Sequence, residues 1–220
     1  MQKWRLVVFD WDGTLMDSAA QIVEAVTRAA VDAGISVPAP DAIRDVIGLG
    51  LHDALSRTMP DLHPDRYASF VELYRGHFLS PELYKSELFP GTRDVLHDLY
   101  RREFLMGVAT GKGRRGLDRE LGESKLHEYF HVTRCADETF SKPHPQMLEE
   151  IMDEVGVLPE HTLMVGDTEY DMEMAANAGI RGIGVSYGVH GAERLKQCKP
   201  LAILKDLREL PEFLSNPGVF

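Results

Sequence analysis

The stretch WRLVVFDWDGTLMDS, residues 4–18, joins a short apolar run to a dense polar turn with almost no transition. The apolar run, residues 6–9, is continuous, which is typical of a strand buried on both faces of a sheet. Asp10 and Asp12 follow it, spaced two apart, and Thr14 adds a small hydroxyl after a glycine that lets the chain turn. The stretch therefore predicts a buried strand with chemistry at its carboxyl end.

The two carboxylates need an explanation of their own. Placing several acidic groups in one turn costs repulsion and desolvation unless a cation or a reacting group compensates. A hard divalent cation such as Mg2+ binds oxygen ligands, usually one or two carboxylates together with water and phosphate oxygens. A solvated Asp-Gly turn after a strand has the same residues. This stretch alone leaves a metal site and an ordinary turn both open.

The bulk composition excludes some classes of function. Apolar residues at 44% and charged residues at 27% of 220 are ordinary for a folded globular chain. The 24 basic and 35 acidic side chains give a net charge of -11. This charge argues against a general nucleic-acid surface and against anionic membranes. A phosphorylated substrate stays possible, because a metal and a few basic groups can invert the field inside one cleft.

The expected location is the cytoplasm. Cys135 and Cys198 make no disulfide framework, which fits a reducing compartment. The first strand begins within a few residues of Met1, which leaves no room for a signal peptide. No apolar run reaches the length needed to span a bilayer.

Element patterns predict an α/β fold. Residues 17–34 and 38–78 carry helical periods and no convincing strand, and residues 88–92 return the chain to a second region. Strand and helix patterns then alternate, which indicates a mostly parallel sheet with helices on both faces. We expect a core domain of residues 1–16 and 87–220 and a small α-helical cap domain of residues 17–86. The expected strands after the return are 104–109, 129–133, 162–165, 182–185 and an edge strand at 202–204, and the expected helices are 92–102, 114–121, 145–155, 169–178 and 206–214.

Further polar side chains fall at strand ends, where open α/β sheets bind ligands. Thr110 could donate its hydroxyl to a phosphate oxygen, and the amide of Gly111 could approach closely because glycine has no Cβ. Lys142, in SKPHP, could neutralise charge on the phosphate and on Asp10. Asp167 and Asp171, in GDTEYD, could complete a metal site. Taken singly, the threonine and the lysine are better explained as an ordinary strand-end threonine and a solvated lysine, and helix capping by Asp167 or Thr168 competes with a metal site.

Together these segments resemble the four signatures of the haloacid dehalogenase-like superfamily, beginning with the DxDGT pattern at Asp10. The resemblance implies that Asp10 is a nucleophile that forms an aspartyl-phosphate, and that Asp12 is the acid and base. It implies that Thr110, Gly111 and Lys142 bind the phosphate. It also implies that Mg2+ is held by the Asp10 side chain, the backbone carbonyl of Asp12 and Asp167, with Asp171 as nearby acidic support.

The helical insert resembles the cap of the subfamily that contains phosphoglycolate phosphatase, β-phosphoglucomutase and small pyrophosphatases. We expect a Mg2+-dependent phosphatase that hydrolyses a small phosphorylated metabolite, similar to phosphoglycolate phosphatase. A sugar-phosphate phosphatase, a nucleotidase, a pyrophosphatase or a phosphomutase would use the same core, and a non-catalytic binding module is the alternative outside enzymes. A dehalogenase is disfavoured, because halide departure needs no proton and Asp12 would have no role.

The sequence defines the residues that select the substrate, and the oligomeric state, less well than the fold and the site. A glycine-flanked segment, residues 48–50, could fold over the site, with Arg44 and His52 nearby, or could only interrupt helices. Lys112 and its neighbours Arg114 and Arg115 could meet an anionic substrate tail or simply begin a solvated helix. The oligomeric state is not readable from these residues.

Overall fold

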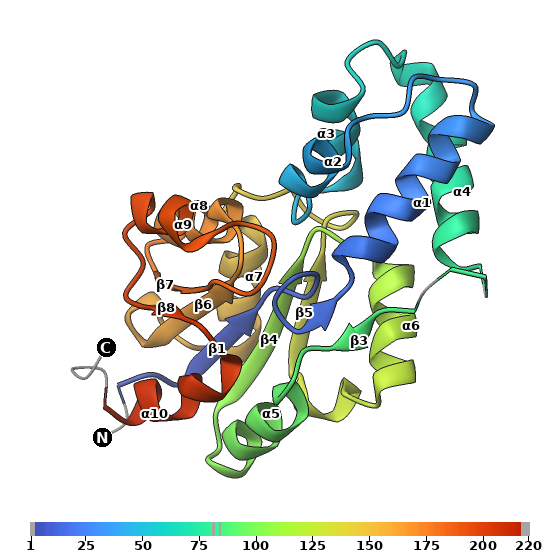
Figure 1. Ribbon diagram of the computed structural model, residues 1–220. Coiled ribbons are helices and arrows are strands. Elements are labelled where there is room, and N and C mark those ends of the chain that lie inside the picture. The colour runs from blue at the N-terminus through green and yellow to red at the C-terminus, as the bar shows by residue number, and fades with distance from the viewer. Residues whose placement is uncertain (1–2, 81, 84, 217–220) are drawn as a thin grey trace.

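The structure is a computed structural model that describes residues 3–80, 82–83 and 85–216. Its centre is a six-stranded parallel sheet in the order β5-β4-β1-β6-β7-β8 (Figure 1). The first strand lies inside the sheet between β4 and β6, as its apolar sequence predicts. The strands are β1 Leu6–Phe9, β4 Leu105–Thr110, β5 Val132–Cys135, β6 Thr162–Gly166, β7 Arg181–Val185 and β8 Ile203–Leu204.

Both faces of the sheet are buried, because successive side chains of a strand point to opposite faces. In β1, Val7 and Phe9 enter one hydrophobic cluster, whereas Leu6 and Val8 enter another. Helices α5, α6 and α10 contribute to the first cluster, and α7 and α8 to the second. This arrangement confirms the predicted α/β class with helices on both faces. The helix bounds are α5 Thr92–Arg101, α6 Arg114–Ser124, α7 Gln146–Val155, α8 Glu169–Asn177, α9 Ala192–Gln197 and α10 Leu210–Ser215.

Four helices stand apart from the sheet, above the carboxyl ends of its strands (Figure 1). We call them the helical cap; they bury a separate apolar cluster that includes Phe70 and Leu55. Two chain segments join cap and sheet, and they pair as a short antiparallel ribbon, β2 with β3. The bounds are α1 Ala19–Asp32, α2 Pro40–Asp45, α3 Leu51–Thr58, α4 Tyr67–Phe78, β2 Met16–Asp17 and β3 Glu87–Leu88.

One predicted strand begins later than expected, and the predicted domain limits are not tested by the structure. The strand expected at residues 129–133 begins later, at Val132, because Tyr129 ends a 3-10 helix, His127–Tyr129. The predicted domain limits stay predictions, and they include residues 1–2, 81, 84 and 217–220, which lie outside the described part. Further 3-10 segments are Pro64–Arg66, Pro159–His161 and Leu207–Glu209.

Within the described ranges, none of the helices combines the length and the apolar character that crossing a bilayer requires.

Candidate active site

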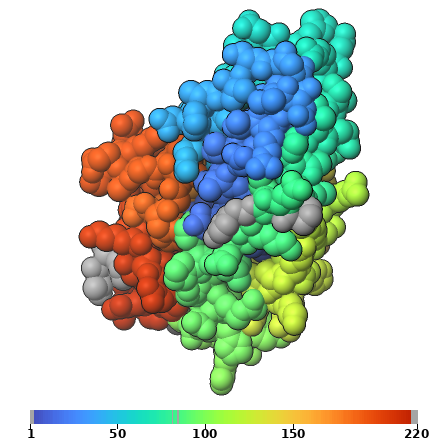
Figure 2. Space-filling view, turned by 45° about the vertical axis from the view of Figure 1, so that its right-hand side comes forward, coloured from blue at the N-terminus to red at the C-terminus, as the bar shows by residue number. Residues whose placement is uncertain are grey.

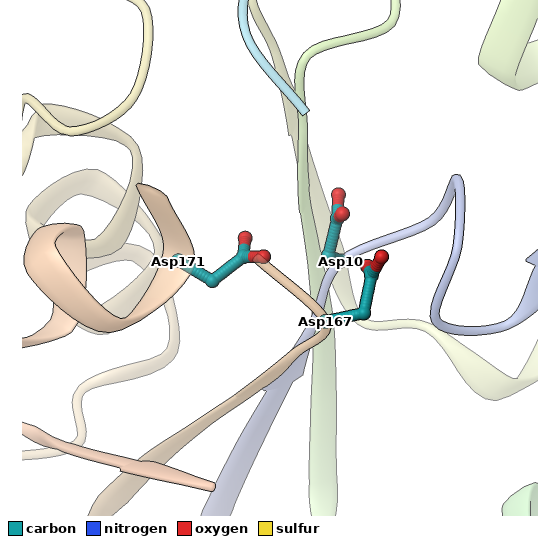
Figure 3. Close-up of side chains that lie close together, drawn as sticks. All are labelled: Asp10, Asp167 and Asp171. Carbon is teal, nitrogen blue, oxygen red and sulfur yellow. The ribbon is translucent and has the colours of Figure 1, made fainter. Parts of the chain in front are cut away.

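Three carboxylates converge where β1 and β6 end (Figure 3). Asp10 follows β1 and Asp167 follows β6, and these two strands are neighbours in register. Asp171 comes from the first turn of α8. Oxygen atoms of the three side chains lie within 4.8 Å of one another, and all three residues are fully buried. The fold therefore gathers a dense negative charge away from water.

One buried cation faces this cluster. The Nζ atom of Lys142, from the loop before α7, lies 2.7 Å from Asp10 Oδ1 and 2.6 Å from Asp171 Oδ1. Its side chain is fully buried. Within the described residues, Asp10 Oδ2 is also buried but has no hydrogen-bond partner. One lysine thus faces three carboxylates and leaves an oxygen of Asp10 unsatisfied.

Burial and mutual repulsion dominate the electrostatics of the cluster. Desolvation raises the pKa of Asp10 well above its ordinary value, against the opposing effect of Lys142. The pKa of Asp167 is raised to about 7, by burial and then by the charge of Asp171. Burial alone would lower the pKa of Lys142, but the carboxylates of Asp10 and Asp171 outweigh it and raise that pKa. The lysine is therefore charged, and the excess acidic groups need a further cation to stay ionised.

The donor set fits a divalent metal. Carboxylate oxygens are ligands for hard cations, and Asp10 offers a buried oxygen that no protein group satisfies. Asp167 is already oriented, because Thr14 Oγ1 donates to its Oδ1 (2.8 Å) and the amide of Val189 donates to its Oδ2 (2.7 Å). The group of Asp10, Asp167 and Asp171 could hold a metal ion. Sequence reasoning missed Val189, since a backbone amide leaves no signal in side-chain types.

Asp171 has two roles in this geometry. Its Oδ2 accepts hydrogen bonds from the amide and hydroxyl of Thr168 and closes a capping box at the start of α8. Its Oδ1 pairs with Lys142. Helix capping and a place in the acidic cluster are thus not alternatives here. Asp167 precedes Thr168, the N-cap residue, so it does not cap the helix and does not lie in its first turn.

Asp12 is not part of this group of three acids, and its side chain has other partners. Ser18 Oγ donates to its Oδ1 (2.6 Å), and Lys112 Nζ lies 3.1 Å from the same atom. The sequence left Lys112 open as a contact for a substrate tail or as part of a solvated helix start; in the structure its ammonium pairs with Asp12 and Glu120. Ser18 was not foreseen, because a serine before a helix is read as a cap. It makes no side-chain cap bond here.

Thr110 and Gly111 lie at the end of β4, the strand beside β1. Thr110 is fully buried, and its hydroxyl oxygen accepts a hydrogen bond from the amide of Lys112 at 3.1 Å, which leaves the hydroxyl proton available. Gly111 lies directly under the cap: a Cβ added there would be 2.4 Å from the carbonyl oxygen of Gly48. Only glycine permits this approach.

The segment of residues 48–50 closes over the sheet. The amide of Gly50 donates to Ser141 Oγ at 2.8 Å, and a Cβ at Gly48 would lie 3.3 Å from Thr168 Oγ1. The segment therefore reaches the loops that carry Lys142 and Asp167. Its predicted neighbours Arg44 and His52 are both exposed.

A second set of contacts ties cap to core along α8 and α9, where blue and orange surfaces meet in Figure 2. Tyr170 donates its hydroxyl to the carbonyl oxygen of Asp45 at 2.8 Å. Arg194 bridges the carboxylates of Asp45 and Glu169. Asp45 belongs to the cap and the other three residues to the core, so these groups form a bridge that is made only when cap and core meet.

The order of these features along the chain matches one family over most of its length. Residues 7–185 fit the family model described as haloacid dehalogenase-like hydrolase. The chain belongs to the haloacid dehalogenase-like hydrolase family.

Two named relatives and one solved structure are similar to this chain over nearly their whole lengths. The chain is 35% identical over 211 residues to a Dickeya dadantii protein named "Probable phosphatase IndB", covering 93% of this chain and 91% of that one. It is 30% identical over 223 residues to the phosphoglycolate phosphatase of Vibrio parahaemolyticus, covering 97% of both. The crystal structure of a Bacteroides fragilis protein named "Putative haloacid dehalogenase-like hydrolase" superposes with a TM-score of 0.87 at 26% identity, covering 94% of this chain and all of that one.

The acidic cluster predicts how the stability of this hydrolase depends on pH and metal. Between the ordinary pKa of Asp167, 3.8, and its raised value of about 7, the folded state keeps a proton that the unfolded state has released. The free energy of unfolding of the metal-free protein should then fall by about 1.4 kcal/mol for each pH unit in this window. We expect a higher melting temperature in chelator at pH 5 than at pH 8, and a larger stabilisation by Mg2+ at pH 8.

Thermal unfolding with chelator or with Mg2+ measures both effects. The variant Asp167→Asn lacks this titration and should lose the part of the pH difference that Asp167 contributes, whereas Asp10, whose pKa burial also raises, keeps its own part. A metal-free wild type whose melting temperature rises from pH 5 to pH 8 would contradict the electrostatic description.

Proposed function

We propose that this hydrolase is a Mg2+-dependent phosphatase that hydrolyses a small phosphorylated metabolite, with 2-phosphoglycolate as the first candidate. The observation that carries the proposal is the buried lysine, Lys142, 2.7 Å from a carboxylate that has a further unsatisfied oxygen. Such a charge pair beside an acidic cluster fits phosphoryl transfer, in which positive groups stabilise the phosphate oxygens. The names of the Dickeya and Vibrio relatives support the reaction, and the second also supports the substrate.

Asp10 is the proposed nucleophile. One of its carboxylate oxygens attacks phosphorus, a bond from that oxygen to phosphorus forms, and the bond from phosphorus to the leaving oxygen breaks. Asp12 gives its proton to the leaving oxygen and then takes a proton from the water that attacks the aspartyl-phosphate. Water thereby releases inorganic phosphate and restores Asp10.

The remaining residues hold the phosphate and the metal. Thr110 donates its hydroxyl, Gly111 its amide, and Lys142 supplies positive charge to the phosphate oxygens. The side chains of Asp10 and Asp167 and the backbone carbonyl of Asp12 are the proposed ligands of Mg2+, with Asp171 supporting them through Lys142. When bound, Mg2+ would supply positive charge to the transferring phosphoryl group and keep the carboxylates ionised.

The proposed size of the substrate follows from the cap. Residues 48–50 contact the loops around the site, so the cap lies directly over the proposed phosphate site, and we infer that a small substrate fits beneath it. We infer that the cap opens to admit substrate and closes to exclude water.

The test is phosphate release from a panel of phosphate esters and pyrophosphate, with Mg2+ or with chelator. The panel holds 2-phosphoglycolate, sugar phosphates, nucleoside monophosphates and pyrophosphate. Selective release from 2-phosphoglycolate that stops in chelator is the expected result. Faster release from another ester would replace 2-phosphoglycolate by that ester as the proposed substrate. Transfer of phosphate between positions of one sugar would favour a mutase. Binding of an ester without release of phosphate from any of them would favour a binding module.

Replacing Gly111 by alanine tests cap closure. The new Cβ would lie 2.4 Å from the Gly48 carbonyl oxygen, closer than such contacts allow, so the cap should no longer seat. We expect kcat/KM to fall by about 10²-fold, the order that follows from a misplacement of about 1 Å. Steady-state kinetics would measure this loss. Gly122→Ala on α6, where an added Cβ meets nothing within 4 Å, is the matched control and should keep full activity; equal rates for both variants would refute the closed geometry.

A further inference from the structure

A second buried cluster of charges consists of Asp12, Lys112 and Glu120. Lys112, in the loop after β4, has a side chain only 8% exposed, and its Nζ lies 3.1 Å from Asp12 Oδ1 and 3.2 Å from Glu120 Oε1. The ring of Phe78, from the cap, covers the ammonium at 4.6 Å. Long charged side chains are seldom buried in this way unless paired.

Glu120 fixes the far end of this cluster. It comes from α6, its side chain is only 10% exposed, and its Oε2 accepts a hydrogen bond from the indole of Trp11 at 2.5 Å. Trp11 stands between Asp10 and Asp12 in the chain. Glu120 thus touches the catalytic turn twice, through the indole of Trp11 and through Lys112.

The contacts on Asp12 fall on one oxygen. Both Ser18 Oγ and Lys112 Nζ reach Oδ1, at 2.6 Å and 3.1 Å. A carboxylate held at Oδ1 presents Oδ2 in a fixed direction, and proton transfer requires such a fixed geometry. A buried ion pair is weak evidence for stability, because its desolvation offsets its attraction. Orientation of Asp12 is the more direct use of this cluster.

We propose that Lys112, anchored by Glu120, is a positioning residue that orients the Asp12 carboxyl group toward the leaving oxygen. The inference rests on the proposed phosphatase activity and concerns only the proton that Asp12 gives to the leaving group. Lys112 itself touches neither the phosphate nor the substrate. Its effect therefore depends on how strongly the leaving oxygen needs that proton.

The experiment compares phenyl phosphates that differ only in the acidity of the leaving phenol: 4-nitrophenyl, 4-chlorophenyl and phenyl phosphate. The variant Lys112→Met keeps the length of the side chain without its charge. We expect kcat/KM to fall little for 4-nitrophenyl phosphate, whose leaving group departs without a proton. For phenyl phosphate it should fall by about 10²-fold, the lower range for loss of general acid catalysis. The plot of log kcat/KM against the pKa of the leaving phenol becomes steeper.

Controls separate this role from others. Lys125→Met removes an exposed cation from the other end of α6 and should leave the slope unchanged. Loss of activity on 2-phosphoglycolate alone, with an unchanged slope for the phenyl series, would overturn the proposal and make Lys112 a contact for the substrate tail. An equal loss for all three esters would reduce it to a structural role. No phosphate release by the wild type would instead refute the proposed function.

A second variant addresses folding. Removal of Lys112 leaves Glu120 and Asp12 buried without a cation, so the single variant can be unstable. The double variant Lys112→Met/Glu120→Gln removes one of these charges and should melt at a higher temperature than the single variant. The steeper slope should persist in it, because Asp12 still lacks its partner. Recovery of the wild-type slope together with stability would overturn the proposal.

Discussion

The variant Asp10→Asn is expected to stop turnover while the protein stays folded. The amide oxygen is a poor nucleophile and cannot form the acyl-phosphate at a useful rate, so kcat should fall by about 10⁴-fold or more, the order lost with a covalent nucleophile. The fold should not suffer in chelator, because the substitution removes a buried carboxylate whose ionised form is disfavoured by burial. Phosphate release and thermal unfolding, measured on one preparation, test both parts.

The control for this experiment is Asp61→Asn, which removes one carboxylate from an exposed loop. It should match the wild type in rate and in melting temperature. Near wild-type turnover by Asp10→Asn would show that Asp10 is not the nucleophile. A large drop of its melting temperature in chelator would contradict the described charge imbalance.

The variant Lys142→Met should damage both activity and stability. Without this lysine three carboxylates remain buried with no cation, and breaking such a pair costs about 3–5 kcal/mol of unfolding free energy. Turnover should fall by about 10³-fold, since one electrostatic donor to the phosphate is lost. Chemical denaturation at pH 8 in chelator would give the stability change, and a smaller change is expected at pH 5, where Asp10 and Asp167, whose pKa values burial raises, regain protons.

Two further variants serve as controls for this prediction. Lys196→Met removes a lysine whose side chain is 60% exposed and should change neither quantity. Lys142→Met/Asp171→Asn removes one acid with the lysine, so stability should return in part while turnover stays low. If the single variant were as stable as the wild type in chelator, Lys142 would not be compensating the cluster.

Much of this molecule was predictable because the strands that carry the acids, β1 and β6, are short, largely apolar and buried throughout. Such runs place Asp10 and Asp167 at the same edge of a parallel sheet, and adjacent strands bring them together. The beginning of β5 was misplaced, because Tyr129 is an apolar residue that packs in the core from a 3-10 helix. Periodicity does not separate these two cases.

The buried position of the Lys112 side chain was not predictable from the sequence. Its sequence neighbours are a glycine on each side and two arginines, which indicate a solvated helix start. Two of its partners, Asp12 and Phe78, are far away along the chain, and the third, Glu120, lies on the following helix α6. A buried lysine of this kind is recognised only when the packing of cap on core is known, because burial rather than residue type decides its role.

The bridge formed by Asp45, Arg194, Glu169 and Tyr170 gives the molecule a dependence on salt that is separate from the chemistry. Arg194 and Asp45 keep about a third and a half of their side chains in water, so dissolved ions screen their attraction. We therefore expect ionic strength to act on the proposed opening of the cap, whereas the enclosed lysine and carboxylates are shielded from dissolved ions. Rates compared between buffers of different salt content would therefore report on the cap first.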